Sequence, residues 1–281
     1  MNKFAILIPC YNCGKTIQAT LDSLLIALAK IEQDWQIYLY DDASSDNSIN
    51  IIKGYSLLNP NIILNVNNAN LGERKNTDLG LNYVSTIYDW VFILNHDDIV
   101  YEECFTSYIS IFNKKDTNAL FSIWSSYNVI DQQGLIISHG DNRNIEIHLK
   151  DFSKRNIIRL IKKTSTPWRI SGCFINLKIL NKLKGFDPHF NQYHDSDLYI
   201  RSIINGYASL YISMPLSAYR ILFTSVSETN FNKNKDIEDR KYFIKKYLNI
   251  LGWYDVFSMC LNILILLGKR KIKKLKRVLI R

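Results

Sequence analysis

The first hundred residues alternate short apolar runs, rich in β-branched and aromatic residues, with stretches whose apolar residues recur at helical spacing. This alternation predicts a parallel sheet covered by helices. The expected strands are residues 4–8, 35–40, 62–66 and 90–94, and the expected helices are residues 16–30, 48–58 and 76–85. A polar segment follows each expected strand. Because ligands bind beyond the carboxyl ends of the strands in an open α/β sheet, we expect these four segments to share one crevice.

The pattern after residue 100 is less regular. It predicts a helix over residues 102–113, strands over 119–127 and 170–176, and an amphipathic helix that begins near Asp195. No internal repeat is present in the sequence. A single α/β domain with a smaller appendage fits a chain of 281 residues.

Composition and charge narrow the class of protein. Apolar residues make up 47% of the chain and charged residues 22%, as in ordinary folded proteins. Residues 269–281 hold eight Lys or Arg and no acid, so 9 − 8 = +1 remains for the rest. A nearly neutral body argues against nucleic acid as a partner. Five scattered cysteines, and an N-terminal apolar run that Pro9 interrupts, predict a reducing compartment and no export signal.

Paired carboxylates follow two of the expected strands. Asp97 and Asp98 come directly after residues 90–94, and Asp41 and Asp42 come directly after residues 35–40. Carboxylates at a strand end suit Mg²⁺ or Mn²⁺, which completes its shell with substrate phosphates. A buried carboxylate also accepts a hydrogen bond from a nucleotide base. The alternative is that each pair forms a turn or caps the following helix.

A third acidic cluster, His194-Asp195-Ser196-Asp197, stands at the expected start of a helix. Asp195 or Ser196 at that position is a candidate N-cap. Asp195 is also a candidate general base, because transfer to a hydroxyl needs a carboxylate within hydrogen-bond reach of the proton. The two roles are compatible.

In their order and spacing these segments resemble glycosyltransferase family 2, the inverting enzymes with the GT-A fold, over residues 3–230. No single segment is specific, but the series as a whole is. The segments that carry the resemblance are Ile6-Leu-Ile-Pro-Cys-Tyr-Asn12, Tyr40-Asp-Asp-Ala-Ser-Ser-Asp46, Asn70-Leu-Gly72 with residues 76–80, Leu94-Asn-His-Asp-Asp98, Ser171-Gly-Cys-Phe174, Gly185-Phe-Asp187 and His194-Asp-Ser-Asp-Leu198.

The resemblance implies a role for each matched residue. Asp195 would be the catalytic base, and Asp98 would bind Mn²⁺ or Mg²⁺ with Asp97 beside it. Gly172 and His194 would lie on the acceptor side, where Trp168 is a further candidate for contact with the acceptor. The remaining donor-binding residues would be Pro9, Tyr11 and Asn12 at the nucleotide, Asp42 at the base, and Arg74 and Lys75 at the diphosphate.

The implied fold class is α/β: a GT-A, Rossmann-like sheet, mostly parallel and flanked by helices, with a C-terminal helical appendage. Residues 1–230 would form the catalytic domain, with nucleotide-sugar binding in about 1–100 and the acceptor side and base in about 101–230. Residues 231–281 would form a helical region with a basic tail. The implied enzyme is a metal-dependent hexosyl- or glycosyltransferase that moves one sugar, from a UDP-sugar by preference, to a glycan or lipid-linked acceptor in bacterial surface polysaccharide, lipopolysaccharide or capsule biosynthesis.

The sequence departs from the family at two positions, and two other functions remain open. Asn95 stands where the family has an acid, and His194 where it has Glu. Both departures are compatible with a catalytically silent GT-A binding or scaffold protein. A nucleotidyltransferase would have a related sheet and metal chemistry, but its first loop would be rich in glycine and basic residues, whereas this loop offers Gly14 and Lys15.

The C-terminal segment predicts a peripheral contact rather than a membrane span. The apolar run over residues 256–267 is shorter than the roughly 20 residues that a span requires. In the basic stretch that follows, Ile272, Leu275 and Leu279 share one helical face, as in helices that lie on anionic membranes. A solvated tail, or a helix that packs on a partner subunit, is the alternative. We therefore expect a cytoplasmic protein with contact at the inner face of the cell membrane through residues 256–281. The oligomeric state is not predicted.

Overall fold

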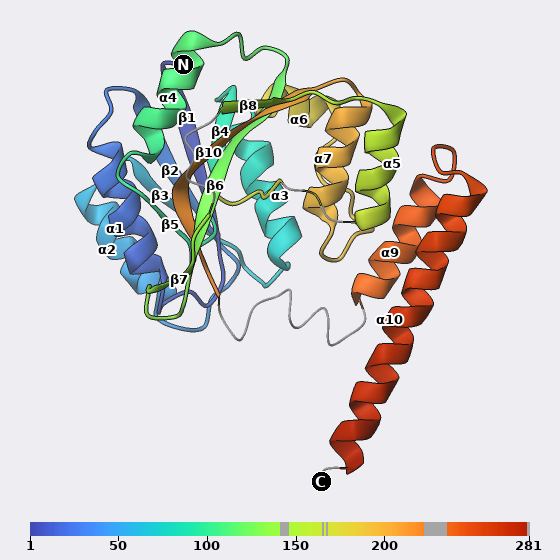
Figure 1. Cartoon of the computed structure of the whole chain (residues 1–281). Helices are drawn as coiled ribbons and strands as arrows, with labels where there is room; N and C mark the ends of the chain where they lie inside the picture. Colours follow the sequence, from blue (N-terminus) through green and yellow to red (C-terminus); the bar gives the residue numbers. More distant parts are fainter. Residues whose placement is uncertain (141–145, 165, 167, 222–234, 280–281) are drawn as a thin grey trace. The chain divides into compact units, whose positions relative to one another are not determined.

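The computed structural model describes residues 1–140, 146–164, 166, 168–221 and 235–279, with the backbone alone for 146–148 and 271–279 (Figure 1). The chain divides into two compact units, each of which is described by itself. The first unit holds residues 1–150, 168–186 and 205–223, and the second holds residues 151–167, 187–204 and 224–281. The expected domain boundary at residue 230 falls outside the described residues, so that division remains a prediction.

The strands described in the first unit form one sheet in the order β3-β2-β1-β4-β9-β6-β10-β5, with β7 paired to β6 and β8 to β10. Strands β3, β2, β1 and β4 are parallel, and β9 enters antiparallel between β4 and β6. The bounds are β1 (Lys3–Cys10), β2 (Asp34–Asp41), β3 (Ile62–Val66), β4 (Trp90–Ile93), β5 (Ile99–Val100), β6 (Leu120–Ile130), β7 (Ile136–Ser138), β8 (Glu146–Leu149), β9 (Cys173–Asn176) and β10 (Ala208–Arg220).

Helices cover both faces of the parallel strands because both faces are apolar. Helices α1 (Ile17–Leu28) and α2 (Ser48–Leu58) lie on one face, and α3 (Glu73–Val84) lies on the other (Figure 1). Ile6 and Ile8 of β1 belong to the core cluster that contains α1, whereas Leu7 lies beneath α3. The four strands and three helices predicted for the first hundred residues are therefore confirmed, with shifts of at most three residues at their ends.

The less regular pattern after residue 100 corresponds to the mixed part of the sheet, in which β9 pairs antiparallel with β4 and β6, whereas β6 and β10 pair in parallel. Helix α4 (Cys104–Lys114) and helix α6 (Leu177–Lys182) belong to this part. Phe174 of β9 packs against Phe4, Phe92 and Phe105, with ring centroids 5.1–6.3 Å apart. An aromatic cluster thus joins β9 to the parallel strands β1 and β4 and fixes where their loops emerge.

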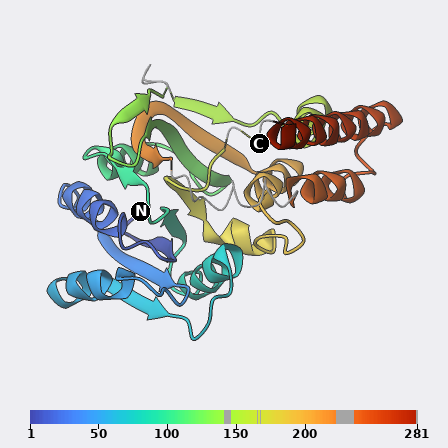
Figure 2. The ribbon, with the colours of Figure 1, turned by 90° about the horizontal axis from the view of Figure 1, so that it is seen from below.

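The second unit is helical in its described part. It contains α5 (Lys154–Lys163), α7 (His194–Ile204), α9 (Lys235–Lys246) and α10 (Trp253–Leu279). Helices α9 and α10 lie side by side, as Figures 1 and 2 both show. Within the described residues, no helix combines the length and the apolar character needed to cross a membrane.

Two helical glycines of the first unit provide a test of how tightly α3 packs on the sheet. A Cβ at Gly80 would lie 2.4 Å from Leu7 Cδ1 and 3.0 Å from Tyr40 Cδ2, whereas a Cβ at Gly54 in α2 would meet nothing within 4 Å. We expect Gly80→Ala to lower the free energy of unfolding by about 1–3 kcal/mol through overpacking. Gly54→Ala, the matched control, should raise it by about 1 kcal/mol through helix propensity. Denaturant titration measures both, and equal effects would contradict this packing.

Candidate active site

The loops that follow β1, β2, β3 and β4 are numbered one to four here. The first two loops are joined by hydrogen bonds at the carboxyl edge of the sheet. The backbone N–H of Asn12, which has a left-handed φ of 48°, donates to Ser44 Oγ at 2.8 Å, and Asn12 Oδ1 accepts from the Ser45 N–H at 2.9 Å. The N–H of Gly14 donates to Asp46 Oδ2 at 2.9 Å. These bonds fix the backbone beside Tyr11, whose side chain is exposed.

Asp42, in the second loop, accepts hydrogen bonds from the third loop. Its carboxylate is 1% exposed and accepts from Asn67 Nδ2 at 2.9 Å and from the N–H groups of Leu71 and Gly72 at 2.8 Å. A carboxylate has about four acceptor positions, so one remains after these three bonds. The expectation that the loops meet at one edge is confirmed for these three, which hydrogen bonds connect directly.

The third loop leads into α3, which starts beside Gly72. Lys75 is exposed in the first turn, while Arg74 forms an ion pair with Asp78 at 2.9 Å. Asn76 is buried and donates from Nδ2 to the carbonyl oxygen of Tyr40 at 2.7 Å. Helix α3 is therefore bound to the end of β2, and the exposed cation that it presents at this edge is Lys75.

Asp98, after β4, is at the centre of a buried ion pair. Its side chain is 2% exposed, and Oδ2 accepts from Arg169 Nη2 at 2.8 Å and from Ser171 Oγ at 2.5 Å. Oδ1 accepts from the backbone N–H of Arg220 at 3.0 Å. The Arg169 guanidinium stacks over the Tyr219 ring at 3.8 Å. Asp98 thereby joins the ends of β4 and β10 to the segment before β9.

This arrangement bears on the expectation that Asp98 is the principal metal ligand, which remains a prediction. Three donors from the protein occupy three of the roughly four acceptor positions of its carboxylate, because burying a carboxylate requires a cation and hydrogen bonds close to it. Among the described residues, no group of three or more His, Cys, Asp or Glu side chains could hold a metal ion. Within the described part of the chain, a metal ion at this edge would therefore find no more than two such side chains together.

Asp97 is held in a different way from its neighbour. Its backbone carbonyl accepts from Arg220 Nε at 2.9 Å, and its side chain is half-buried. Burial and the neighbouring charge of Asp98 raise the pKa of the Asp97 carboxyl. An added cation would stabilise a desolvated carboxylate close to a like charge, so Asp97 is a candidate beside Asp98 for contact with a metal ion.

The acceptor-side candidates of the first unit are fixed next to Asp98. Gly172 has a left-handed φ of 81°, and its N–H donates to the Ile93 carbonyl at 2.8 Å. A Cβ at this position would lie 2.7 Å from Ser217 Oγ, so only glycine fits. Trp168 is 3% exposed and packs against Phe121, which makes it a core residue of this unit.

The thiols of Cys10 and Cys13 lie beneath the first loop and are both buried. Burial raises the pKa of Cys10, while the hydrogen bond with Cys10 lowers the pKa of Cys13 to about 7. The Cys13 N–H donates to Ser48 Oγ at 2.7 Å. The C-x-x-C spacing therefore belongs to the packing between the first loop and the start of α2.

Asp195 and His194 belong to the second unit, in the first turn of α7. The expected helix near Asp195 is confirmed, since α7 begins at His194. Asp195 is half-buried, and its Oδ1 accepts from the Ser196 N–H at 2.6 Å. Its carboxylate thus has a defined orientation at a helix N-terminus.

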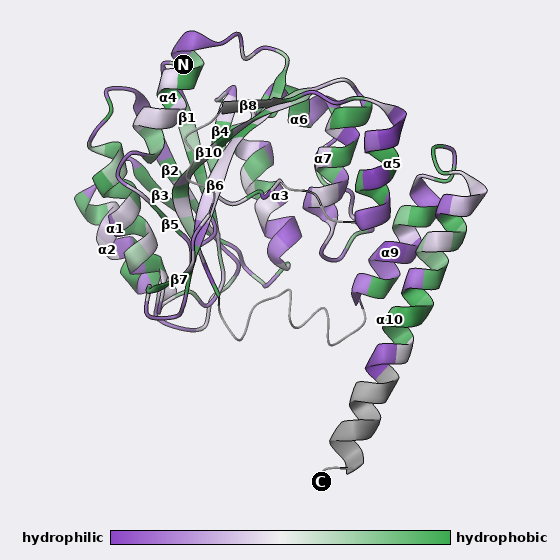
Figure 3. Ribbon diagram, in the orientation of Figure 1, coloured by the Kyte–Doolittle hydropathy of each residue, from purple (hydrophilic) through white to green (hydrophobic). Residues whose placement is uncertain are grey.

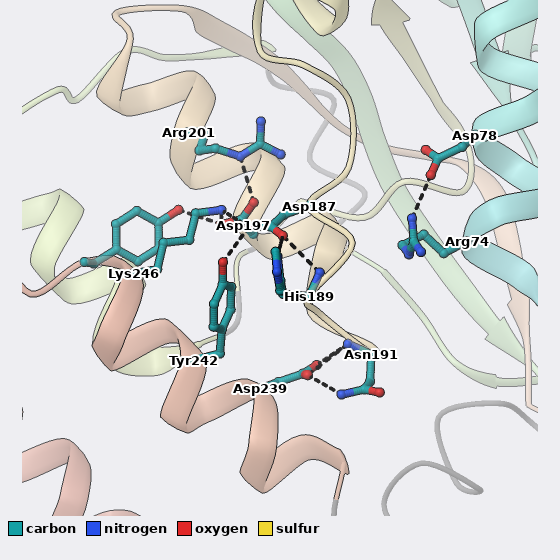
Figure 4. A network of polar contacts seen from close by, with 11 residues as sticks. Arg74, Asp78, Asp187, His189, Asn191, Asp197, Arg201, Asp239, Tyr242 and Lys246 are labelled. Atoms are coloured by element: carbon teal, nitrogen blue, oxygen red, sulfur yellow. Dashed lines mark hydrogen bonds and ion pairs between the residues drawn. The ribbon is translucent and has the colours of Figure 1, made fainter.

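The loop that precedes α7 is held by one carboxylate of α9. Asp239 is fully buried and accepts hydrogen bonds from the backbone N–H groups of Asn191, shown in Figure 4, and of Gln192 and Tyr193, at 2.8–3.1 Å. It also accepts from Asn191 Nδ2 at 2.8 Å. The three residues immediately before His194 are therefore anchored by a side chain that lies more than forty positions further along the chain.

A second ionic cluster fixes α7 itself. Asp197 is fully buried and pairs with Arg201 at 2.7 Å and with Lys246 at 2.6 Å (Figure 4). Lys246 also pairs with Asp187 at 2.6 Å. Although burial acts in the opposite direction, the hydrogen bonds from Lys246 and His189 lower the pKa of Asp187. Helix α9 thus binds both ends of the segment that carries Asp195.

Sequence reasoning missed several of these residues. Nothing in the sequence around Arg169 identifies it as the partner of Asp98, although a buried acid requires some cation. Arg220 lies after the segments that carry the resemblance, so nothing in them identifies it. Asp239 and Lys246 lie beyond the segments that carry the resemblance. The sequence of α9 indicates only a helix rich in charged residues.

Comparisons with known proteins agree with this architecture. A family model described as glycosyl transferase family 2 matches residues 5–182. A poly(ribitol-phosphate) beta-N-acetylglucosaminyltransferase, TarP of Staphylococcus aureus, is 31% identical over 104 residues, which cover 36% of this chain and 30% of that protein. The matched region thus spans less than a third of that relative.

Two solved structures show the same fold. S. aureus TarS residues 1–349, in complex with UDP-GlcNAc, has a TM-score of 0.61 and 14% identity, covering 88% of this chain and 73% of that one. The mannosyltransferase PcManGT of Pyrobaculum calidifontis, in complex with GDP-Man and Mn²⁺, has a TM-score of 0.57 and 13% identity, covering 97% and 80%. The predicted α/β, GT-A architecture is therefore confirmed, and the chain belongs to glycosyl transferase family 2.

The two acids after β4 should respond differently to substitution. Asp98→Ala leaves Arg169 without its partner in a buried position, and we expect a loss of about 3–5 kcal/mol in the free energy of unfolding. Asp97→Ala removes a side chain outside this ion pair and should change stability by less than about 1 kcal/mol. Thermal and denaturant unfolding measure both values. A larger loss for Asp97→Ala than for Asp98→Ala would refute the assignment of Asp98 as the structural acid.

Asp239→Ala should loosen the loop before α7. It leaves the backbone N–H groups of residues 191–193 without their acceptor, at a cost of about 1–3 kcal/mol for each group that stays buried. We expect faster amide hydrogen exchange at residues 191–195. The matched control is Glu238→Ala, which removes the exposed acid beside it. Equal exchange in the two variants would show that Asp239 does not anchor this loop.

Proposed function

We propose that this protein is an inverting glycosyltransferase that moves a single sugar from a nucleotide-sugar donor, with UDP-sugars favoured, to a hydroxyl of a glycan or lipid-linked acceptor. We place it in the synthesis of bacterial surface polysaccharide, lipopolysaccharide or capsule. The observation that carries the proposal is the family match, which spans the four loops at the carboxyl edge of the sheet. The names of TarP and of the TarS complex with UDP-GlcNAc support the nucleotide and the process.

The donor side of the proposal rests on loops that are already organised. Pro9, Tyr11 and Asn12 would border the nucleotide, and the remaining acceptor position of Asp42 would receive a base N–H. Lys75, exposed at the start of α3, would face the diphosphate. The Arg74 guanidinium, paired with Asp78, would contribute charge from a fixed position. Preorganised donors of this kind stabilise a departing anion without rearrangement.

For Mn²⁺ or Mg²⁺ we assign Asp97 as the ligand from the protein, with Asp98 as the acid that holds the loop in place. The described residues offer no group of three or more His, Cys, Asp or Glu ligands, and such ions complete their shells with substrate phosphates. When bound, the ion would neutralise charge on the leaving nucleoside diphosphate. The PcManGT complex with GDP-Man and Mn²⁺ is the neighbour that supports a metal.

Asp195 is the proposed general base. It would accept the proton of the attacking hydroxyl as that oxygen bonds to the anomeric carbon and the diphosphate departs, which inverts the configuration. His194 would orient Asp195 or border the acceptor. Trp168, buried against Phe121, would act by supporting the Gly172 segment rather than by stacking on a sugar.

The test is nucleoside diphosphate release by the purified chain across UDP-, GDP- and dTDP-sugars, with Mn²⁺ or with a chelator. We expect metal-dependent UDP release that falls by about 10²–10⁴ in Asp195→Asn and by a similar factor in Asp97→Asn. Asp89→Asn, which alters an exposed surface pair with Lys178, is the matched control.

Three outcomes would contradict the proposal. Unchanged turnover in Asp97→Asn and Asp195→Asn would remove the catalytic assignments. Binding of the donor without turnover in the wild type would indicate a catalytically silent GT-A protein. Asn95 and His194, which replace acids of the family, are compatible with that outcome. Release of pyrophosphate from a nucleoside triphosphate would indicate a nucleotidyltransferase.

A further inference from the structure

Helix α10 carries a continuous apolar stripe that faces solvent. Trp253 is 81% exposed, Phe257 60% and Leu264 64%. Their spacing of four and seven residues places them on one side of the helix, so they form a line along its first half. Figure 3 shows apolar residues along this half of α10. The stripe is completed by Tyr254, Leu261 and Ile265, which are all exposed.

The other side of α10 is already occupied within the second unit. Met259 and Ile263 are 4% and 6% exposed, and they face away from the stripe. Asp255 pairs with Lys162 of α5 at 2.9 Å, and Arg270 pairs with Asp236 of α9 at 2.6 Å. The orientation of α10 about its own axis is therefore fixed by contacts with α5 and α9, and the stripe is the side that these contacts leave outside.

The charge that follows the stripe indicates what it binds. Residues 269–281 contain eight Lys or Arg and no acid, and the helix continues to Leu279. In the sequence, Ile272, Leu275 and Leu279 continue the spacing of Phe257, Leu261 and Leu264. A second copy packed in parallel would bring the same positive charge to the same place and would be repelled. An anionic surface would be attracted.

We infer that α10 docks on an anionic lipid surface. The helix lies in the plane of the interface, with Trp253, Phe257 and Leu264 among the acyl chains, and its basic second half runs along the anionic surface. Helices with an aromatic and aliphatic face beside Lys and Arg bind membranes in this way, and aromatic rings favour the interfacial depth. The cytoplasmic leaflet carries anionic lipids, which attract basic segments of this kind. This inference is independent of the proposed transferase activity.

Cosedimentation of the full chain with vesicles tests the inference. Vesicles of phosphatidylglycerol and phosphatidylcholine should bind the chain at least about tenfold more tightly than phosphatidylcholine alone, and raised salt should weaken the binding. The double variant Phe257→Ser, Leu264→Ser should lose about tenfold or more in affinity. Leu57→Ser with Leu58→Ser, two exposed leucines of α2, is the matched control and should bind like the wild type.

A fluorophore on Cys260 gives a second readout, because this thiol is exposed in α10 whereas the other four are buried. Its emission should shift to the blue on anionic vesicles and stay unchanged on neutral ones. Equal binding by the wild type and the Phe257, Leu264 variant would overturn the inference, provided circular dichroism shows both folded. A concentration-dependent dimer that the same variant abolishes would assign the stripe to a second copy and would also overturn it.

Discussion

The ion pair between Asp98 and Arg169 is the interaction on which the organisation of the first unit's carboxyl edge depends. It is buried, and Asp98 is further held by Ser171 and by the backbone of Arg220. These partners come from the segment before β9 and from the end of β10, strands that enter the sheet far apart in sequence. A charge of this kind is stable inside the protein only with all its partners in place. The loop after β4 can therefore adopt few conformations other than the one seen.

Asp98 also determines what its neighbour can do. Successive residues cannot both point into the same buried ion pair, so fixing Asp98 directs Asp97 elsewhere, and Arg220 Nε holds the Asp97 carbonyl. The other loops are also fixed by side-chain oxygens that accept hydrogen bonds from a neighbouring loop. Asp42 holds the third loop in this way, and Asn12 holds the second. A set of short hydrogen bonds between loops gives an edge that is organised before any ligand binds, which is what electrostatic stabilisation of a leaving group requires.

The sequence predicts the parallel half of the sheet well because local patterns determine it. Each of its strands is a short apolar run, each helix has its own periodicity, and the loop order follows from the topology. The roles of Asp97 and Asp98 could not be separated in this way. Both are acids at a strand end, and which one is buried depends on Arg169, more than seventy positions away. The role of Asp239 could not be predicted either, because its hydrogen-bond partners lie 46–48 positions earlier in the sequence.

The second unit shows how a candidate catalytic acid can depend on residues outside the matched family region. The family model ends at residue 182, whereas Asp195 and everything that anchors its loop come later. Asp239 accepts from three successive backbone N–H groups, an arrangement that fixes the path of the chain rather than one side chain. Lys246 then joins the acids at both ends of the segment, Asp187 and Asp197. Because these contacts are charged and buried, the geometry around Asp195 is set by α9. A substitution in that helix would therefore shift the candidate base even though the substituted residue does not contact it.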